Sequence, residues 1–285
     1  MNRYPLRVRK FGPRMIILSI YGEHLPDLEG EIGIGSFITL LKCFGFSEQA
    51  TRSAIARMHH HGMIEVRRIG KASYYSLSED LKVHLRQSGE RIFIRKNYEW
   101  DGFWNIVVYF IPESYRGLRD KIRQELIRIG YGPLAPATWI SPNDFTKQVF
   151  DLAKRYNASK YVKIFQTSNI NGDPKNLINR CWDINKIKRK YNNFIEDYAP
   201  KMEHYQNLQK NGENVEPAEY FVERCNLVND YRNLMMADPD LPMSLLPKNW
   251  PRPRAVQLFN NYHQILAKNT QKYVQSIIEA YGHGS

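Results

Sequence analysis

Apolar residues recur at helical spacing in three stretches near the start of the chain. Residues 14–21 read as a short apolar helix, which Gly22 and Pro26 bring to an end. A second helix is predicted over residues 36–44, with its apolar positions in one stripe. The pattern therefore predicts two short helices that bury a common face.

The third helix begins after Ser47, a favourable N-cap residue, and Glu48 suits the positive end of the helix dipole. One face of this helix is apolar: Ala50, Ala54, Ile55 and Met58. The opposite face is small, polar and cationic: Gln49, Arg52, Ser53, Ala56 and Arg57. A helix of this kind packs on one side and offers the other to a partner.

A β-hairpin is predicted directly after the third helix. Residues 63–67 and 73–77 have the composition of strands, and residues 68–72 form a basic turn centred on Gly70. Helix, turn, helix and basic hairpin in this order are typical of a winged helix-turn-helix. In such a domain the third helix enters the major groove and the hairpin contacts the DNA backbone or minor groove.

The rest of the chain changes character twice. After a charged helix over residues 79–96, strands and helices alternate over 103–111, 115–129, 132–140, 143–156 and 161–166, which predicts a ferredoxin-like α/β sandwich. Helices then dominate, over 176–198, 217–237 and 253–281. We therefore expect an α+β multidomain protein: a winged helix-turn-helix over 1–90, a ferredoxin-like central domain over 91–172 and a helical C-terminal domain over 173–285.

The charge of the chain points to a polyanionic partner. Lys and Arg number 41 against 29 Asp and Glu, a formal net charge of +12. A basic surface can also serve solubility alone, so the position of the charges must decide. Their concentration on the third helix and the hairpin favours double-stranded DNA over an ordinary solvated face.

Particular side chains suit the two tasks of DNA recognition. Gln49 and Arg52 on the third helix are the predicted base contacts, with Ser53 and Arg57 beside them. Phosphate contacts are expected from the hairpin: Arg67, Arg68, Lys71 and Ser73.

The sequence gives little support for disulfides, metal binding or membrane insertion. Cys43, Cys181 and Cys225 lie far apart, which encodes neither a disulfide framework nor a zinc cluster. The run of three histidines after Met58 reads as a helix end, because adjacent side chains on a helix point in different directions. Residues 1–11 are rich in arginine and hold no apolar signal-peptide core, and no apolar run approaches the roughly 20 residues that a membrane span needs. We therefore expect a cytoplasmic protein with no membrane association and no metal.

An ordered series of short strings resembles the PaaX family, the repressors of phenylacetic acid degradation, over nearly the whole chain. The first half of the series runs Gly30-Glu31-Ile32 into Gly35-Ser36, Arg68-Ile69-Gly70-Lys71 with Ser73 and Tyr75, Trp100-Asp101-Gly102-Phe103-Trp104, Gly132 with Leu134-Ala135-Pro136, and Ser141-Pro142. The second half runs Cys181-Trp182 with Tyr191 and Phe194, Arg232 before Asp238-Pro239-Asp240-Leu241-Pro242, Leu245-Leu246-Pro247, and Trp250-Pro251 with Ala255.

The resemblance implies a winged-helix domain, a central domain similar to a CRISPR-associated small nuclease, and a helical C-terminal domain. It also implies a homodimer on palindromic operator DNA. Phenylacetyl-CoA, or another aryl-CoA, would bind as the effector and release the DNA, and no cofactor is implied.

A site for an acyl-CoA needs cations beside an aromatic-lined cavity. The candidate cations are Arg180, Arg232, Arg252 and Arg254, and the candidate aromatic residues are Trp100, Trp104, Trp182 and Trp250. Each Trp could instead serve core or interface packing. Arg232 could instead form a structural ion pair, with Asp238 as its partner.

Two rival interpretations remain. The central domain could be a metal-dependent nuclease, or the C-terminal part an acyl-CoA-processing enzyme. The chain has no GxSxG, HExxH or Gly-rich phosphate loop, and residues 107–111 of the expected first strand hold no carboxylate for a metal. We therefore expect no enzymatic activity. The winged domain could also be a protein-interaction module that does not touch DNA.

Overall fold

The computed structural model describes residues 11–25, 29–70, 72–93, 99–213 and 215–282. Over this part of the chain the fold is mixed α and β, with two small sheets and the helices α1 to α10. It divides into two compact units. Unit 1 contains Met1–Arg95, Phe194–Arg232 and Arg254–Ser285, and unit 2 contains Lys96–Asn193 and Asn233–Pro253.

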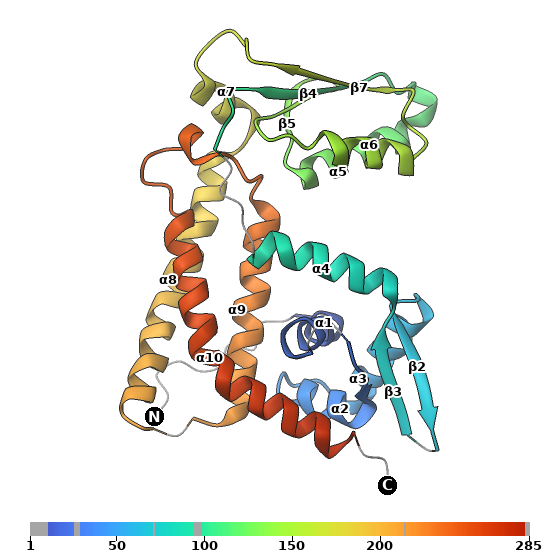
Figure 1. The fold of residues 1–285 in the computed structure, drawn as a ribbon, viewed down its shortest axis with the longest axis vertical. Coiled ribbons are helices and arrows are strands. Elements are labelled where there is room, and N and C mark those ends of the chain that lie inside the picture. The colour runs from blue at the N-terminus through green and yellow to red at the C-terminus, as the bar shows by residue number, and fades with distance from the viewer. Residues whose placement is uncertain (1–10, 26–28, 71, 94–98, 214, 283–285) are drawn as a thin grey trace. The chain divides into compact units, whose positions relative to one another are not determined.

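Unit 1 begins with three helices and a small antiparallel sheet (Figure 1). Its elements are α1 (Pro13–His24), β1 (Ile32–Gly33), α2 (Ile34–Lys42), α3 (Glu48–His60), β2 (Ile64–Ile69), β3 (Ala72–Leu77) and α4 (Glu79–Phe93). The strand order β1-β3-β2 places the hairpin partner β3 in the middle. The helical faces predicted to be apolar are buried, with Ile16, Phe37 and Ile55 at most 2% exposed.

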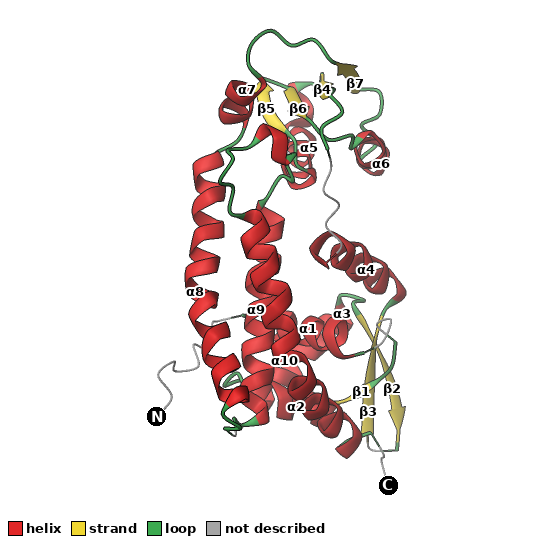
Figure 2. Cartoon of the chain, turned by 60° about the vertical axis from the view of Figure 1, so that its left-hand side comes forward, coloured by secondary structure: helices red, strands yellow, loops and turns green. Residues whose placement is uncertain are grey.

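Two late helices complete the hydrophobic core of unit 1. The long helices are α8 (Ile184–Lys210), α9 (Pro217–Ala237) and α10 (Arg252–Ala280), and each contributes residues to both units. Phe221 and Cys225 of α9 and Val274 of α10 belong to the same core as the residues of α1 to α3. Figures 1 and 2 both show α1 between α9 and the β2–β3 hairpin. The first ninety residues therefore do not form a closed core by themselves.

A buried charge network also joins α1 to these helices. The carboxylate of Glu23, at the end of α1, accepts hydrogen bonds from Nε of Arg224 (3.1 Å) and from Nε2 of His263 (2.6 Å). Burial would raise the pKa of Glu23, but the hydrogen bonds and charges of His263 and Arg224 hold it below its ordinary value. The neighbouring His24 donates from Nδ1 to Oε1 of Gln271 on α10 at 3.0 Å.

Tyr281, the residue that follows α10, packs against α2 and the glycine before it. A Cβ atom at Gly35 would lie 2.3 Å from Cδ1 of Tyr281, and one at Gly33 would lie 3.0 Å from the Tyr281 carbonyl oxygen. The Oγ1 of Thr39 donates to Oη of Tyr281 at 3.3 Å. The two glycines therefore give Tyr281 the space it occupies.

Unit 2 contains a four-stranded antiparallel sheet with helices over one face (Figure 1). Its elements are β4 (Trp104–Tyr109), α5 (Arg116–Ile129), β5 (Gly132–Ala135), β6 (Thr138–Ser141), α6 (Thr146–Arg155), β7 (Val162–Thr167) and α7 (Pro174–Cys181). The strands lie in the order β5-β6-β4-β7. Val107 and Tyr109 of β4 pack with Ile122, Leu126 and Val149 of the two helices in one core.

A buried ion pair holds the segment between α9 and α10 in unit 2. The guanidinium of Arg252 donates to both oxygens of Asp238, at 3.0 Å each, and to the Leu241 carbonyl at 2.8 Å. The hydroxyl of Tyr191 also donates to Asp238. The ion pair suggested between Arg232 and Asp238 is therefore wrong: Arg252 is the partner, and Arg232 donates instead to Oδ1 of Asn229 at 2.9 Å.

Two segments differ from the sequence prediction. The helix expected over 176–198 is interrupted, because Oδ1 of Asp183 accepts from the amide of Lys186 (2.8 Å) and starts a new helix, α8. The extended segment 132–140 is a hairpin of β5 and β6, and Ala137 at its turn has a φ of 56°. Among the described helices, none combines the length and the apolar character that a bilayer span needs.

Candidate nucleic-acid interface

Helix α3 is fixed at both ends by local contacts. At its start Oγ of Ser47 accepts from the amide of Ala50 at 3.2 Å, as the predicted N-cap requires. Oγ1 of Thr51 donates back to the Ser47 carbonyl at 3.1 Å. At its end Gly62 has a φ of 65°, the left-handed conformation that favours glycine after a helix.

The outward face of α3 is open to solvent. Gln49, Arg52, Ser53 and Arg57 are all exposed, while Ala54, Ile55 and Met58 behind them are buried. Nε of Arg52 donates to Oε1 of Glu48 at 2.8 Å, an exposed pair one turn apart on the helix. The four predicted contact residues therefore lie together on one accessible surface of α3, although Arg52 has a carboxylate partner.

The β2–β3 hairpin follows α3 along the chain (Figure 2). Its register pairs Arg68 with Ser73 and Ile69 with Ala72, and Gly70 at the turn has a φ of 57°. Arg68 and Ile69, predicted to lie in the turn, are the last residues of β2. Lys71, a predicted phosphate contact, lies outside the described residues.

The two arginines of β2 differ in their surroundings. Nε of Arg67 donates to Oε1 and Oε2 of Glu31, at 2.8 Å each, and its guanidinium carbon lies 5.7 Å from the centre of the Tyr74 ring. The hydrogen bond from Arg67 lowers the pKa of Glu31. Within the described part of the chain Arg68 is exposed and has no carboxylate within ion-pair distance. Arg68 is thus the more available cation.

The three histidines close α3, as the sequence predicts. His60 is its last residue and His61 follows as the C-cap, with its amide donating to the Arg57 carbonyl at 3.0 Å. Nδ1 of His59 lies 3.0 Å from the carbonyl oxygen of Ile64. This hydrogen bond ties the helix end to the first residue of β2.

The four candidate tryptophans of an effector site all lie in unit 2. Trp104 is buried, and its ring centre lies 5.3 Å from that of the half-exposed Trp100. Trp182 is buried and donates from Nε1 to the Gly130 carbonyl at 3.3 Å. Trp250 is buried against Tyr191, with the ring centres 6.1 Å apart. Trp104 and Trp250 therefore serve packing, which was the alternative to a role in ligand binding.

The four candidate arginines do not come together in one group. Arg252 is buried in its pair with Asp238, and Arg232 is half-buried in unit 1, where desolvation lowers its pKa. Arg254 is exposed in unit 1. Arg180 and Trp182 both line an open hollow of about 580 Å³ at the junction of α7 and α8. This hollow is the place where a predicted cation and a predicted aromatic residue meet.

Several residues that contact the predicted site residues, or that line a cavity, were not predicted from the sequence. Glu31, the partner of Arg67, lies 36 residues before it, so local pattern gives no sign of the pair. Glu48 lies four residues before Arg52, a spacing that favours an ion pair on a helix and could have been noticed. A cavity lined by Tyr220 and Lys272 joins residues far apart in the sequence.

Comparisons with known proteins cover most of the chain. Three family models match in chain order: "PaaX-like protein" over 13–81, "PaaX protein central Cas2-like domain" over 97–178 and "PaaX-like protein C-terminal domain" over 182–276. The transcriptional repressor PaaX of Escherichia coli is 29% identical over 264 residues, 91% of this chain and 82% of the repressor. The solved structure of the uncharacterized protein Rv0674 from Mycobacterium tuberculosis matches with a TM-score of 0.63 and 21% identity, covering 92% of this chain and 98% of the other.

Proposed function

The chain belongs to the PaaX family, and on this basis we propose that it is a transcriptional repressor that binds operator DNA. One observation carries the proposal for this molecule. The exposed polar face of α3, with Gln49, Arg52, Ser53 and Arg57, is followed directly by a hairpin that presents Arg68. Base-reading and phosphate-binding side chains thus occur on two adjacent elements.

The order of elements supports a winged helix-turn-helix as the reading domain. Helices α2 and α3 are the helix-turn-helix pair, and the β2–β3 hairpin is the wing. In the proposed complex α3 lies in the major groove, where Gln49 and Arg52 reach base edges. Arg57, Arg68, Lys71 and Ser73 bind phosphates, and Arg67 contributes once it leaves Glu31.

Unit 2 has the element order of a ferredoxin-like domain. Its sequence β4-α5-β5-β6-α6-β7 and the strand order β5-β6-β4-β7 support that assignment. We place no catalysis there. The strand β4 carries no carboxylate, and the nearby Asp101 uses Oδ1 to accept from the amide of Phe103 at 2.9 Å. Incubation of the protein with labelled DNA and Mg²⁺ or Mn²⁺ tests this, and reproducible cleavage would overturn it.

The family assignment extends to regulation. The E. coli relative is a repressor named PaaX, and we propose that this chain acts as a homodimer released from DNA by phenylacetyl-CoA or another aryl-CoA. The hollow at Arg180 and Trp182 provides one cation and one aromatic surface for such an effector. The effector must favour the conformation that binds DNA poorly.

Selection of bound fragments from a random duplex pool tests DNA binding and yields the operator. We expect enrichment of a palindromic sequence, since a symmetric dimer reads two equal half-sites. Gel shifts on that operator with added phenylacetyl-CoA then test the effector. Enrichment without release would refute only the effector, whereas a pool without enrichment would refute sequence-specific repression.

A further inference from the structure

Most of the positive charge of the chain lies outside the unit that carries α3 and the hairpin. Unit 1 holds 22 Lys and Arg against 18 Asp and Glu, a net charge of +4. Unit 2, the smaller of the two, holds 19 Lys and Arg against 11 Asp and Glu, a net charge of +8. The unit proposed to read DNA therefore accounts for only a third of the net charge.

Three cations of unit 2 lie together near the start of α8. Over residues 185–193 the exposed side chains are Asn185, Lys186, Arg189, Lys190 and Asn193. Lys186, Arg189 and Lys190 follow the spacing i, i+3, i+4, which places them on one side of the helix. We call these three residues the α8 patch. Within the described part of the chain none of them has a carboxylate within ion-pair distance.

The α8 patch opposes the stability of its own helix. Lys186 lies three and four residues before Arg189 and Lys190, and like charges at these spacings repel each other. The first turn of α8 holds no acidic residue, so no charge there offsets the repulsion between these cations and the positive end of the helix dipole. In α6, by contrast, Lys154 and Arg155 lie in the last turn, where the dipole favours cations. Departures from local stability rules are expected at functional surfaces.

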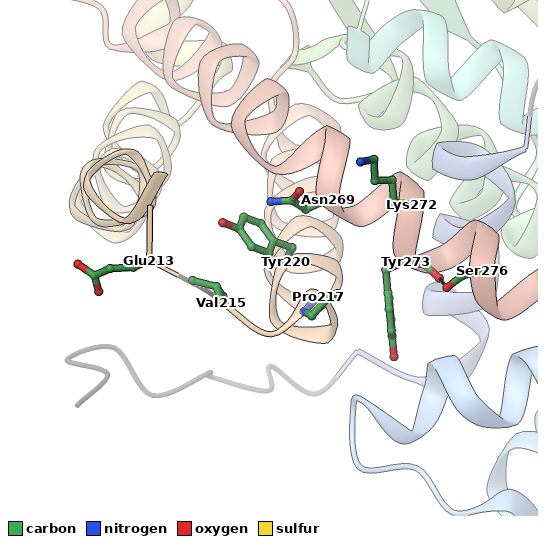
Figure 3. A pocket seen from close by; sticks show the side chains of 8 residues that line it. All are labelled: Glu213, Val215, Pro217, Tyr220, Asn269, Lys272, Tyr273 and Ser276. Carbon is green, nitrogen blue, oxygen red and sulfur yellow. Dashed lines mark hydrogen bonds between the residues drawn. The ribbon is translucent and has the colours of Figure 1, made fainter. Parts of the chain in front are cut away.

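The charge of the α8 patch also lies outside the hollows of the two units. Among the described residues, the cavity at the start of α9 is lined by one cation, Lys272, and one carboxylate, Glu213 (Figure 3). The hollow at the junction of α7 and α8 is likewise lined by Arg180 and Asp183. The unbalanced charge is thus on the open surface of α8, which suits an extended polyanion better than a small anion.

We infer that the α8 patch binds the phosphate backbone of duplex DNA, as a second contact that carries no sequence information. Lys and Arg neutralise phosphates, and amide side chains such as those of Asn185 and Asn193 donate hydrogen bonds to phosphate oxygens. No aromatic side chain is exposed over residues 185–193, whereas surfaces for single-stranded nucleic acid commonly stack bases on aromatic rings. The inference rests on the proposed function, which brings operator DNA to the protein.

Fluorescence anisotropy of the full chain on a long random-sequence duplex, over a series of salt concentrations, tests the contact. The triple variant Lys186→Gln/Arg189→Gln/Lys190→Gln should bind at least about tenfold more weakly at about 0.1 M salt. Its salt slope should fall by about 2 to 3, since each lost phosphate contact removes about 0.9. Affinity for the selected operator within flanking DNA should fall by the same factor, because backbone contacts do not depend on sequence.

Two further variants separate the α8 patch from net charge in general. Arg123→Gln/Lys154→Gln/Arg155→Gln removes three exposed cations of α5 and α6 and lowers the net charge by the same amount. This control should bind both duplexes like the unaltered chain. Lys186→Arg/Lys190→Arg keeps the charge of the patch and should retain the affinity and the salt slope.

Thermal unfolding without DNA shows whether weaker binding comes from a damaged fold. The α8 triple variant should melt at or above the temperature of the unaltered chain, because it relieves repulsion between like charges. The single variants Lys186→Gln and Lys190→Gln should each lower the salt slope by about 1, so the test does not depend on the triple variant.

Three results would overturn the inference. They are equal salt slopes in the two triple variants, a loss of affinity confined to the operator, and patch-dependent binding that is tighter for single-stranded RNA than for duplex DNA. A random duplex pool without enrichment would instead refute the proposed repressor. The failure of the α8 contact is therefore distinguishable from the failure of the proposed function.

Discussion

Arg67 and Glu31 form a two-point ion pair, with Nε of Arg67 at 2.8 Å from each carboxylate oxygen. The pair joins β2 to Glu31, the residue just before β1. It engages the guanidinium of Arg67, so this group is less available to DNA than that of Arg68. We predict unequal effects from the two neighbouring arginines. Arg68→Ala should lower affinity for a random-sequence duplex and reduce the salt slope by about 1, while Arg67→Ala should change both less.

The same pair allows a gain-of-affinity test. Glu31→Gln removes a negative charge beside the hairpin and frees Arg67, so non-specific affinity should rise and the salt slope should steepen. Fluorescence anisotropy over a series of salt concentrations measures both quantities. Should Arg67→Ala weaken binding as much as Arg68→Ala while Glu31→Gln has no effect, the ion pair does not restrain Arg67.

Base reading by α3 predicts a loss of specificity rather than of affinity in general. Gln49→Ala and Arg52→Ala should each reduce the difference in binding free energy between the selected operator and a random duplex by about 1 to 3 kcal/mol. Binding to the random duplex should change little for Gln49→Ala. Arg123→Ala, an exposed arginine on α5 of unit 2, is the control and should alter neither affinity. If this difference in binding free energy is unchanged in both α3 variants, these residues are not base contacts.

The contact between Gly35 and Tyr281 predicts a difference between two glycine substitutions. Gly22→Ala lies on α1 with open space around the new Cβ, so it should gain the usual advantage of alanine in a helix. Gly35→Ala should be about 1 to 3 kcal/mol less stable than Gly22→Ala, since its Cβ meets the Tyr281 ring. Urea unfolding measures the difference. Tyr281→Ser should abolish it if the ring is the cause.

Unit 1 should lose stability in mild acid because of His24. Burial, opposed by the hydrogen bond with Gln271, lowers the pKa of His24 from 6.5 to about 4. Between these values the unfolded chain takes up a proton that the folded chain does not, so the free energy of unfolding falls as the pH falls. The loss is at most about 3.5 kcal/mol, since each pKa unit corresponds to about 1.4 kcal/mol.

Unfolding of His24→Gln at several pH values isolates this contribution. The variant should show a flatter pH dependence between pH 6.5 and about 4 than the unaltered chain. Glu23, with its lowered pKa, stabilises the fold above the ordinary glutamate pKa of 4.5, and this part begins to be lost as the pH falls below that value. An identical slope in both proteins over that window would show that His24 is not the titrating group.

The buried pair in unit 2 predicts a structural rather than an effector role for Arg252. Arg252→Met removes the guanidinium that bonds both oxygens of the buried Asp238 and should cost about 3 to 5 kcal/mol. The double variant with Asp238→Asn should recover part of this loss. Arg254→Met, at an exposed position two residues later, should unfold like the unaltered chain. Equal stability of the two single variants would contradict the assignment.

Features set by neighbouring residues were predictable from the sequence. The cap at Ser47, the end of α3 before Gly62 and the exposure of Gln49 and Arg57 follow from helix periodicity and turn chemistry over a few positions. The bounds of α9 agree with the prediction for the same reason, since Pro217 starts a clear helical pattern. Local rules suffice where the determining contacts are local.

Contacts between distant segments were not predictable. Periodicity shows that Phe221 and Val274 belong to buried faces, but it does not show that those faces meet α1 to α3. The Arg67–Glu31 pair depends on the pairing of β1 with β3, which brings exposed charges together across the sheet. Arg252 and Trp250 read as candidate ligand contacts because residue type alone does not distinguish a buried partner from a free side chain.

The shared core of unit 1 also affects how the protein is made. During synthesis, α1 to α3 leave the ribosome long before Phe221 and Val274 exist to cover their apolar faces. The nascent N-terminal segment therefore exposes apolar surface while well over a hundred further residues are translated. During this period aggregation or binding to chaperones competes with folding. The surface proposed to read DNA therefore becomes fully stable only when α10 is in place.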